Sequence, residues 1–307
     1  MLLDAAAAGD RVALARVLSA VERGGDEART TGRLTFPRSG QAYTVGITGA
    51  PGSGKSTLTS ALSTIIRTRD ERLAVLAVDP SSPFSGGAIL GDRVRMQAHA
   101  TDDGVYIRSM ATRGNQGGLA LATPLAIRVL DAVGWPWVVV ETVGVGQVEV
   151  AIAGEADTTV VVVNPGWGDA VQANKAGLME VADLFVINKA DRPGVQDTRR
   201  DILQMLELSS LSQVRGWDPP VVETVAVEGE GAEEVWDAVA RHRAHIESTG
   251  ELATRRTDRL RTELRAVLHH SIDEQIRART GGGYEEIEAA VLAREVDPYT
   301  AAEQLLS

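Results

Sequence analysis

GITGAPGSGKST, residues 46–57, is the stretch that decides the fold of this 307-residue chain. Residues 49–56 match G-x-x-x-x-G-K-[ST], the pattern of a loop that binds phosphate groups. Its glycines let several backbone N–H groups turn toward one anion, because no side chains stand in between. The apolar run before the loop (43–48) predicts a buried strand, and the segment after it (55–67) predicts a helix. The sequence therefore predicts a site for a nucleoside triphosphate.

The residues of this loop have separable roles. Lys55 is expected to reach the β- and γ-phosphates, and the Ser56 hydroxyl is expected to ligate Mg²⁺. The helix that begins near Lys55 points its positive end at the same charge. We expect the phosphates to be held by Gly52, Ser53, Gly54, Lys55, Ser56 and Thr57.

The composition excludes several classes of function. The chain has 31 basic and 42 acidic residues, and its net charge of −11 argues against nucleic acid or an anionic membrane as the main partner. It has no cysteine, which excludes disulfides, thiolate metal sites and cysteine nucleophiles. The N-terminal segment is amphipathic and charged, unlike a signal peptide. Since no uncharged run approaches about 18 residues, we expect a cytoplasmic protein that spans no membrane.

Apolar segments alternate with helical ones through the middle of the chain. Strands are predicted at 43–48, 73–78, 105–110, 137–141, 158–164, 184–188 and 221–225. Helices are predicted at 55–67, 119–133, 170–181 and 232–245. Strands that are apolar throughout, alternating with helices, indicate a parallel sheet covered on both faces. The predicted class is α/β, a mostly parallel P-loop NTPase sheet flanked by helices, with helical N- and C-terminal extensions.

The two ends of the chain differ from the middle. At the N-terminus we predict one helix up to Gly24, followed by a polar linker over residues 26–40. From about residue 251 the pattern is helical only, and a break at Gly281 is followed by two short helices, the last beginning near Thr300. One apolar stripe is formed by Leu260, Leu264, Val267, Leu268, Ile272 and Ile276. The predicted division is a helical extension (1–40), a P-loop domain (41–250) and a C-terminal helical arm (251–307).

The base of the nucleotide is predicted from Asn188-Lys189-Ala190-Asp191, which follows an apolar strand. N-K-x-D in this place is the guanine reader of GTPases. The Asp191 carboxylate can accept hydrogen bonds from N1–H and the 2-amino group of guanine, whereas ATP would leave the carboxylate unpaired. A missing partner at a buried polar site discriminates by up to about 10⁴-fold. Val225 and Ala226 end the next strand, where a GTPase presents backbone N–H groups to the guanine O6.

Acidic residues at strand ends are candidates for the Mg²⁺ and water side of the site. Glu141 begins E-T-V-G-V-G-Q, where many GTPases have D-x-x-G and the acid holds Mg²⁺ through water. Asp79 and Asp92 flank a loop rich in Pro, Ser and Gly, of the kind that orders over a γ-phosphate. We predict Ser56, Asp79, Asp92 and Glu141 as the metal site, and Lys55, Asp92 and Glu141 as the catalytic residues. The alternative for each acid is an exposed loop residue.

Together these motifs resemble one family in particular. GITGAPGSGKST, LAVDPSS, GDRVRM, VYIRSMATRG, ETVGVGQ, NPGWGD and NKAD occur in this order. The set is similar to the MeaB/ArgK family, the accessory GTPases of methylmalonyl-CoA mutase, over about residues 45–226. The resemblance implies GTP or GDP with Mg²⁺, and a homodimer formed through the C-terminal arm. It also implies a partner, an adenosylcobalamin-dependent acyl-CoA mutase, whose cofactor loading the protein gates and which it protects or reactivates.

The resemblance assigns roles by position. Asp79, Asp92 and Glu141 would handle Mg²⁺ and water, and Asn188, Lys189 and Asp191 would read the base. The family's third switch, which couples the nucleotide state to the mutase, would include Trp167, Asp169, Gln172 and Lys175. Hydrolysis would be slow alone and stimulated by the partner. This chain departs from the family with Val225, a position that is often Ser, and with the bulky Trp167.

Two other functions and several details stay open. One alternative is a P-loop kinase or ATPase of the ArgK type linked to amino-acid transport, although N-K-x-D disfavours ATP. Another is a chaperone for nickel, which requires a His or Cys cluster that the sequence lacks. The apolar stripe of the arm has the alternative of folding back on its own chain. The mutase served, the mode of cobalamin delivery and the water-activating group are left open.

Overall fold

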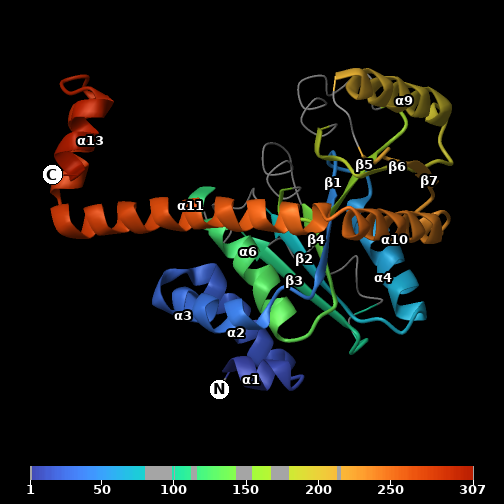
Figure 1. Cartoon of the computed structure of the whole chain (residues 1–307), viewed down its shortest axis with the longest axis horizontal. Coiled ribbons are helices and arrows are strands. Elements are labelled where there is room, and N and C mark those ends of the chain that lie inside the picture. Colours follow the sequence, from blue (N-terminus) through green and yellow to red (C-terminus); the bar gives the residue numbers. More distant parts are fainter. Residues whose placement is uncertain are drawn as a thin grey trace. The chain divides into compact units, whose positions relative to one another are not determined.

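The computed structural model describes residues 2–79, 99, 101–111, 116–142, 154–166, 180–212 and 216–306 (Figure 1). The chain divides into two compact units, 1–259 and 260–307. The boundary between the units falls inside one long helix, α11 (Glu251–Thr280). The predicted three-part division, with boundaries after residues 40 and 250, stays a prediction.

Strands of the described chain form a seven-stranded sheet in the order β3-β2-β4-β1-β5-β6-β7, and every neighbouring pair is parallel. The strands are β1 (Tyr43–Thr48), β2 (Leu73–Asp79), β3 (Val105–Ala111), β4 (Trp137–Thr142), β5 (Thr158–Val163), β6 (Leu184–Asn188) and β7 (Val221–Thr224). Their sequences are apolar throughout because both faces of the sheet are covered. The predicted α/β P-loop NTPase class is confirmed.

Strand β1 lies in the middle of the sheet, between β4 and β5. From β1 the chain crosses to β2 on the β4 side, and after β4 it continues with β5 on the other side. A reversal of this kind leaves a crevice at the carboxyl ends of the strands, where α/β sheets bind their ligands. The predicted phosphate loop leaves β1 at this crevice.

Helices cover the two faces of the sheet (Figure 1). They include α2 (Arg11–Arg23), α4 (Lys55–Thr68), α6 (Gln116–Ala132) and α10 (Ala232–Ser248). Helices α4 and α10 pack in the core that contains Val45 and Val139, whereas α2 and α6 pack in the core that contains Val138 and Val140. Neighbouring residues of β4 thus enter different cores, because successive side chains of a strand point to opposite faces.

Helix α9 (Val195–Ser212) forms where the sequence analysis predicts no element. Its buried residues include Val195, Thr198 and Ile202, at spacings of three and four residues. Val195 and Ile202 pack in a third core with Phe185 of β6. Apolar residues also lie on its exposed side, with Leu203 and Leu208 accessible to solvent, so the helical period is weak in the sequence and did not predict the helix. The helix predicted over 170–181 lies outside the described residues, apart from its last two.

The N-terminal segment forms α1, α2 and α3 instead of one continuous helix. Helix α1 (Leu2–Ala7) ends before Gly9, whose φ of +99° is left-handed. Asp10 then caps α2 by accepting hydrogen bonds from the N–H groups of Val12 and Ala13 at 2.8 and 3.0 Å. The prediction of one helix is wrong because this stop and cap lie inside it.

Helix α3 (Gly25–Thr35) occupies the segment predicted as a polar linker (26–40), so that prediction is also wrong. A short 3₁₀ helix, η1 (Phe36–Arg38), follows it. The side chains of Ala28 and Thr35 are buried, and α3 contacts both α2 and α6. A helix that lies on other helices needs only a few small contacts, and its polar exposed face resembles a linker in sequence.

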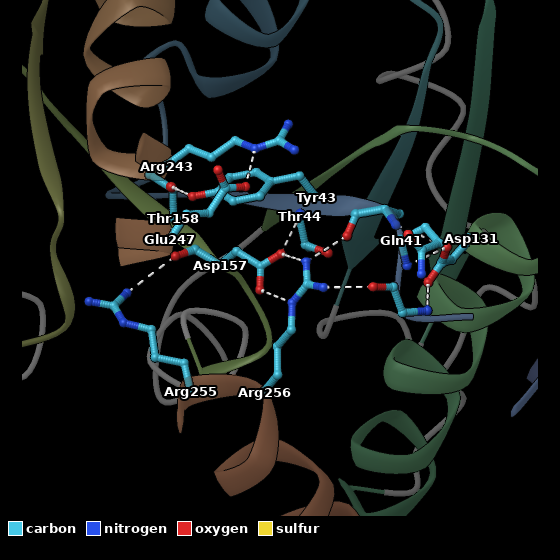
Figure 2. Close-up of polar contacts among 12 residues, drawn as sticks. Gln41, Tyr43, Thr44, Asp131, Asp157, Thr158, Arg243, Glu247, Arg255 and Arg256 are labelled. Carbon is cyan, nitrogen blue, oxygen red and sulfur yellow. Dashed lines mark hydrogen bonds and ion pairs between the residues drawn. The ribbon is translucent and has the colours of Figure 1, made fainter. Parts of the chain in front are cut away.

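Asp157, a buried carboxylate just before β5, holds the first turns of α11. It accepts hydrogen bonds from the Arg256 guanidinium at 2.8 and 3.2 Å and from the Thr44 N–H at 3.0 Å (Figure 2). Arg259 pairs with the same carboxylate. Burial raises the pKa of Asp157, but the hydrogen bond from Arg256 and the charges of Arg259 and Arg256 outweigh it and hold the pKa below its ordinary value. The carboxylate is therefore ionised.

Asp183, just before β6, repeats this arrangement. Arg255 donates to both carboxylate oxygens at 2.9 Å, and the Thr159 N–H donates at 2.8 Å. The Nε2 atom of the buried His242 lies 3.2 Å from Oδ1. Burial raises the pKa of Asp183, but His242 and Arg255 outweigh it, so the pKa is also low. Removing one partner of such a buried pair typically costs about 3–5 kcal/mol. The first turns of α11 are therefore an integral part of the first unit.

The second unit contains the rest of α11, α12 (Gly283–Leu292) and α13 (Pro298–Leu306). The last helix begins two residues before the predicted Thr300, and its cap is Asp297 instead of Thr300. Asp297 caps α13 by accepting from the N–H groups of residues 299 and 300 at 2.9 and 3.1 Å, with Pro298 in the first turn. Among the described helices of the chain, none has the length and apolar character needed to cross a membrane.

Candidate functional site

The predicted phosphate loop begins where β1 ends, and it lies directly against β5. Gly49 follows β1 with a φ of +140°. A Cβ atom on Gly49 would overlap the backbone carbonyl of Val162 in β5. Glycine is needed at this position for both reasons, since other residues rarely adopt this φ and have no room here.

Side chains from neighbouring strand ends hold the loop from outside. The carbonyl of Ser53 accepts a hydrogen bond from Asn188 Nδ2 at 2.7 Å. The carbonyl of Gly52 accepts from Lys189 Nζ at 2.6 Å and from Asn164 Nδ2 at 3.3 Å. In a trans peptide the N–H points away from the C=O, so fixing the Ser53 carbonyl outward turns the Gly54 N–H inward. N–H groups that point into the loop are the groups that bind a phosphate.

Lys55 places its positive charge inside the same loop. Its side chain is 6% exposed, and Nζ donates to the carbonyls of Gly49 at 2.5 Å and Ala50 at 3.2 Å. Lys55 is also the first residue of α4, so the positive end of the helix dipole lies at the same place. The ammonium group and the helix terminus together favour a highly charged anion, as expected of a triphosphate site.

Ser56 and Glu141 meet at the bottom of the site. Glu141 lies opposite Ile47 in the pairing of β4 with β1, which brings it beside the start of α4. The Ser56 hydroxyl donates to Glu141 Oε1, and both side chains are buried. A hydroxyl beside a carboxylate supplies the hard oxygen ligands that Mg²⁺ prefers, so these residues fit the predicted metal. When bound with the nucleotide, Mg²⁺ would neutralise phosphate charge.

The other predicted acids are less completely placed. Asp79 ends β2, and Val78 pairs with Thr142 of β4, so the backbone of Asp79 reaches the sheet edge at which Glu141 lies. Asp92 lies outside the described residues. The predicted coupling residues Trp167, Asp169, Gln172 and Lys175 lie outside them as well.

Asn188 joins the phosphate loop to the predicted base side. Its amide oxygen accepts hydrogen bonds from Thr224 Oγ1 and from the Ala226 N–H, both at 3.1 Å. The Val225 N–H donates to the carbonyl of Glu230 at 3.2 Å. Both N–H groups predicted to meet guanine are therefore used within the chain in this structure. Asn188 itself acts here as a bridge between two loops, and its role toward the base stays a prediction.

Lys189 and Asp191 are less buried than Asn188. Lys189 has a φ of +60°, the left-handed conformation that non-glycine residues rarely adopt. Residues in such conformations cluster at ligand sites, and here the turn lets Lys189 reach the loop while Asp191 stays exposed. An exposed carboxylate two residues after Lys189 is accessible to a base that arrives from solvent.

The sequence analysis missed two residues of this arrangement, Asn164 and Thr224. Asn164 follows the apolar run of β5 in the same way that Asn188 ends the apolar run of β6. A polar residue at the carboxyl end of a buried parallel strand was the available signal. This signal identifies Glu141 and Asn188 in the sequence analysis, and it applies equally to Asn164.

We expect a Gly54→Ala substitution to weaken GDP binding at least about tenfold. Gly54 has a φ of +92°, and a Cβ atom would overlap Asn188 Nδ2, so the methyl group would break the hydrogen bond that holds the Ser53 carbonyl outward. Titration calorimetry with GDP measures the effect. Gly32→Ala is the matched control, because a Cβ there meets only Leu125 at an ordinary 3.6 Å. Equal affinity of both variants would contradict the role of Asn188.

Known proteins resemble this chain over most of its length. A family model described as "Methylmalonyl Co-A mutase-associated GTPase MeaB" matches residues 14–281. A Pyrococcus abyssi protein whose name proposes a GTPase is 49% identical, over 99% of this chain and 95% of its own. A mouse protein named "Methylmalonic aciduria type A homolog, mitochondrial" is 36% identical, over 86% of this chain and 65% of its own.

A solved structure, titled "Crystal structure of LAO/AO transport system kinase", superimposes with a TM-score of 0.69 at 26% identity. The alignment covers 99% of this chain and 95% of that one. The resemblance seen in the sequence motifs is confirmed, and the roles of individual residues stay predictions. This chain belongs to the MeaB family, the methylmalonyl-CoA mutase-associated GTPases.

Proposed function

We propose that this GTPase is the accessory protein of an adenosylcobalamin-dependent acyl-CoA mutase, with methylmalonyl-CoA mutase as the favoured partner. It gates the loading of the mutase cofactor, and it protects or reactivates the mutase. The observation that carries the proposal is the family match over residues 14–281, which includes the entire candidate site and whose description names that mutase. The name of the mouse relative supports the same metabolic context.

The proposed reaction is hydrolysis of GTP to GDP and phosphate with Mg²⁺. Lys55 and the α4 terminus hold the phosphates, and Ser56 and Glu141 hold the metal together with Asp79 and Asp92. Charge neutralisation and positioning supply most of the catalysis in phosphoryl transfer. We propose a slow intrinsic rate that the partner increases.

A kinase is the second candidate, because the superimposed structure is titled a transport system kinase. The two proposals differ in the base that the site selects. The exposed Asp191 carboxylate supports guanine, which offers it two donors where adenine offers an acceptor.

We expect Asp191→Asn to weaken GTP binding by about 10²-fold or more and to favour xanthosine triphosphate, which has an acceptor in place of the 2-amino group of guanine. Titration calorimetry with GTP, ATP and xanthosine triphosphate measures this shift. Asp26→Asn, an exposed carboxylate of α3, is the control and should leave all three affinities unchanged. Unchanged GTP affinity of Asp191→Asn would remove Asp191 from the base site and favour the kinase.

Coupling to the mutase is proposed for Trp167, Asp169, Gln172 and Lys175. Glycines flank Trp167, and tryptophan is strongly enriched at interface hot spots. Asp169 and Lys175 are six residues apart, so they do not form a helical i, i+4 pair with one another.

We expect purified methylmalonyl-CoA mutase to bind the protein more tightly with a non-hydrolysable GTP analogue than without nucleotide, and to accelerate GTP turnover. Lys175→Ala and Asp169→Ala should keep the basal turnover and lose the acceleration, because allosteric coupling requires a second site that is distinct from the nucleotide site. Surface plasmon resonance and phosphate release measure the two effects. If the mutase neither binds nor accelerates turnover, the proposed partner is wrong. Full stimulation of both variants would move the coupling elsewhere in the chain.

A homodimer through the second unit is also proposed. The stripe along α11 is exposed in the single chain, with Leu264 68% and Leu268 53% accessible. Apolar surface of this kind is normally buried against a partner. The stripe therefore supports a helix-to-helix contact between two copies.

We expect the whole chain to sediment as a dimer at micromolar concentration, and a chain ending at Arg259 to be a folded monomer that binds GDP. A chain ending at Gly250 should lose about 3–5 kcal/mol or more of stability, because Asp157 and Asp183 would stay buried without their arginines. Sedimentation velocity and thermal melting measure the three chains. A monomeric whole chain would favour the stripe folding back on its own chain.

A further inference from the structure

Asn164, the residue that follows β5, contacts the phosphate loop through one atom. Its Nδ2 lies 3.3 Å from the carbonyl oxygen of Gly52, the same oxygen that Lys189 Nζ approaches to 2.6 Å. The amide oxygen of Asn164 is buried and has no hydrogen-bond partner in the described part of the chain. The contact with Gly52 is therefore the hydrogen bond through which this side chain can act.

The peptide between Gly52 and Ser53 is fixed at both of its ends. Its carbonyl accepts from Asn164 and Lys189, and its N–H donates to the carbonyl of Ala50 at 3.1 Å. Gly52 has a φ of +74° and no side chain to resist rotation of the adjoining peptide. A turned peptide would point a carbonyl into the phosphate site, where it would repel the anion. The external donors prevent this rotation.

Asn164 also connects the loop to a second part of the fold. Two residues further on, the N–H of Gly166 donates to the buried Thr198 of α9 at 3.1 Å. The end of β5 is thus held by the phosphate loop on one side and by α9 on the other. These two hydrogen bonds can be removed independently, which gives a matched pair of variants.

We propose that Asn164 is a positioning residue for GTP binding and hydrolysis. It shares the Gly52 carbonyl with Lys189, keeps that carbonyl directed away from the phosphates, and acts through the loop without contacting the nucleotide. The inference rests on the assignment of residues 46–57 as the nucleotide site. It extends that site to the end of β5, where the sequence motifs include Asn164 but assign it no role.

The test compares Asn164→Ala with Thr198→Val in the full-length protein. Loss of one hydrogen bond to the loop should raise the Kd for GDP and the KM for GTP about fivefold in Asn164→Ala, with kcat within about twofold. The geometry of the loop affects ground and transition states alike, so KM changes and kcat does not. Thr198→Val, which removes the hydrogen bond to Gly166 and keeps the side-chain volume, should bind GDP as the wild type does.

A double-mutant cycle with Lys189→Met separates positioning from a general structural role. In each single variant one donor still holds the Gly52 carbonyl, whereas the double variant has neither donor. The double variant should therefore lose more GDP affinity than the two single losses combined, by about threefold or more. Additive losses would overturn the proposal, as would wild-type affinity of Asn164→Ala. Lys55→Ala reports on the underlying site. If Lys55→Ala binds GDP normally, the site assignment and this proposal both fail. If Lys55→Ala loses binding and Asn164→Ala does not, the site assignment stands and the role of Asn164 is overturned.

Discussion

The phosphate loop can bind an anion only if the carbonyls of Gly52 and Ser53 stay directed away from it, and the loop alone does not ensure this. Gly52 and Gly54 permit the necessary backbone conformation, but glycine permits many others equally well. Asn188 on the Ser53 carbonyl, with Lys189 and Asn164 on the Gly52 carbonyl, selects one of them. Three strand ends therefore determine the shape of a loop whose own sequence is mostly flexible. The close approach of Asn188 to Gly54 also makes glycine obligatory at that position.

The opposite edge of the sheet holds a second charged arrangement with a different purpose. Asp157 and Asp183 precede β5 and β6 and receive three arginines from the first turns of α11. Both carboxylates are nearly inaccessible to solvent. Their burial is tolerated because the arginines pair with their negative charges. Because Asp157 also accepts from the N–H of Thr44, the strand that leads to the phosphate loop is tied directly to α11. One sheet thus carries ligand chemistry at its carboxyl edge and a structural anchor at its amino edge.

These two edges share the strands β1 and β5. Strand β1 runs from the Thr44 N–H at the anchor to Gly49 at the loop, and β5 runs from Asp157 to Asn164. Short buried strands paired in register are stiff, since each backbone group is bonded to a neighbour. The geometry of the nucleotide site and the attachment of α11 therefore depend on the same pair of strands.

Features that are encoded by neighbouring residues could be predicted before the structure was known. G-x-x-x-x-G-K-S, the apolar strands and N-K-x-D each occupy a short segment, and together they were sufficient for the fold class. The family followed from seven short motifs in their order, among them E-T-V-G-V-G-Q. The break at Gly9 and the caps at Asp10 and Asp297 are equally local and were available in the sequence, although the predictions did not use them. The contacts between distant groups became known from the folded chain alone. Folding brought Asn164 to Gly52 and Arg256 to Asp157, and it stabilised α3 and α9, whose own apolar patterns are weak. A hydrogen bond between residues about a hundred positions apart depends on strand order and register, and strands that are apolar throughout carry no alternation of polar and apolar residues that would specify the register.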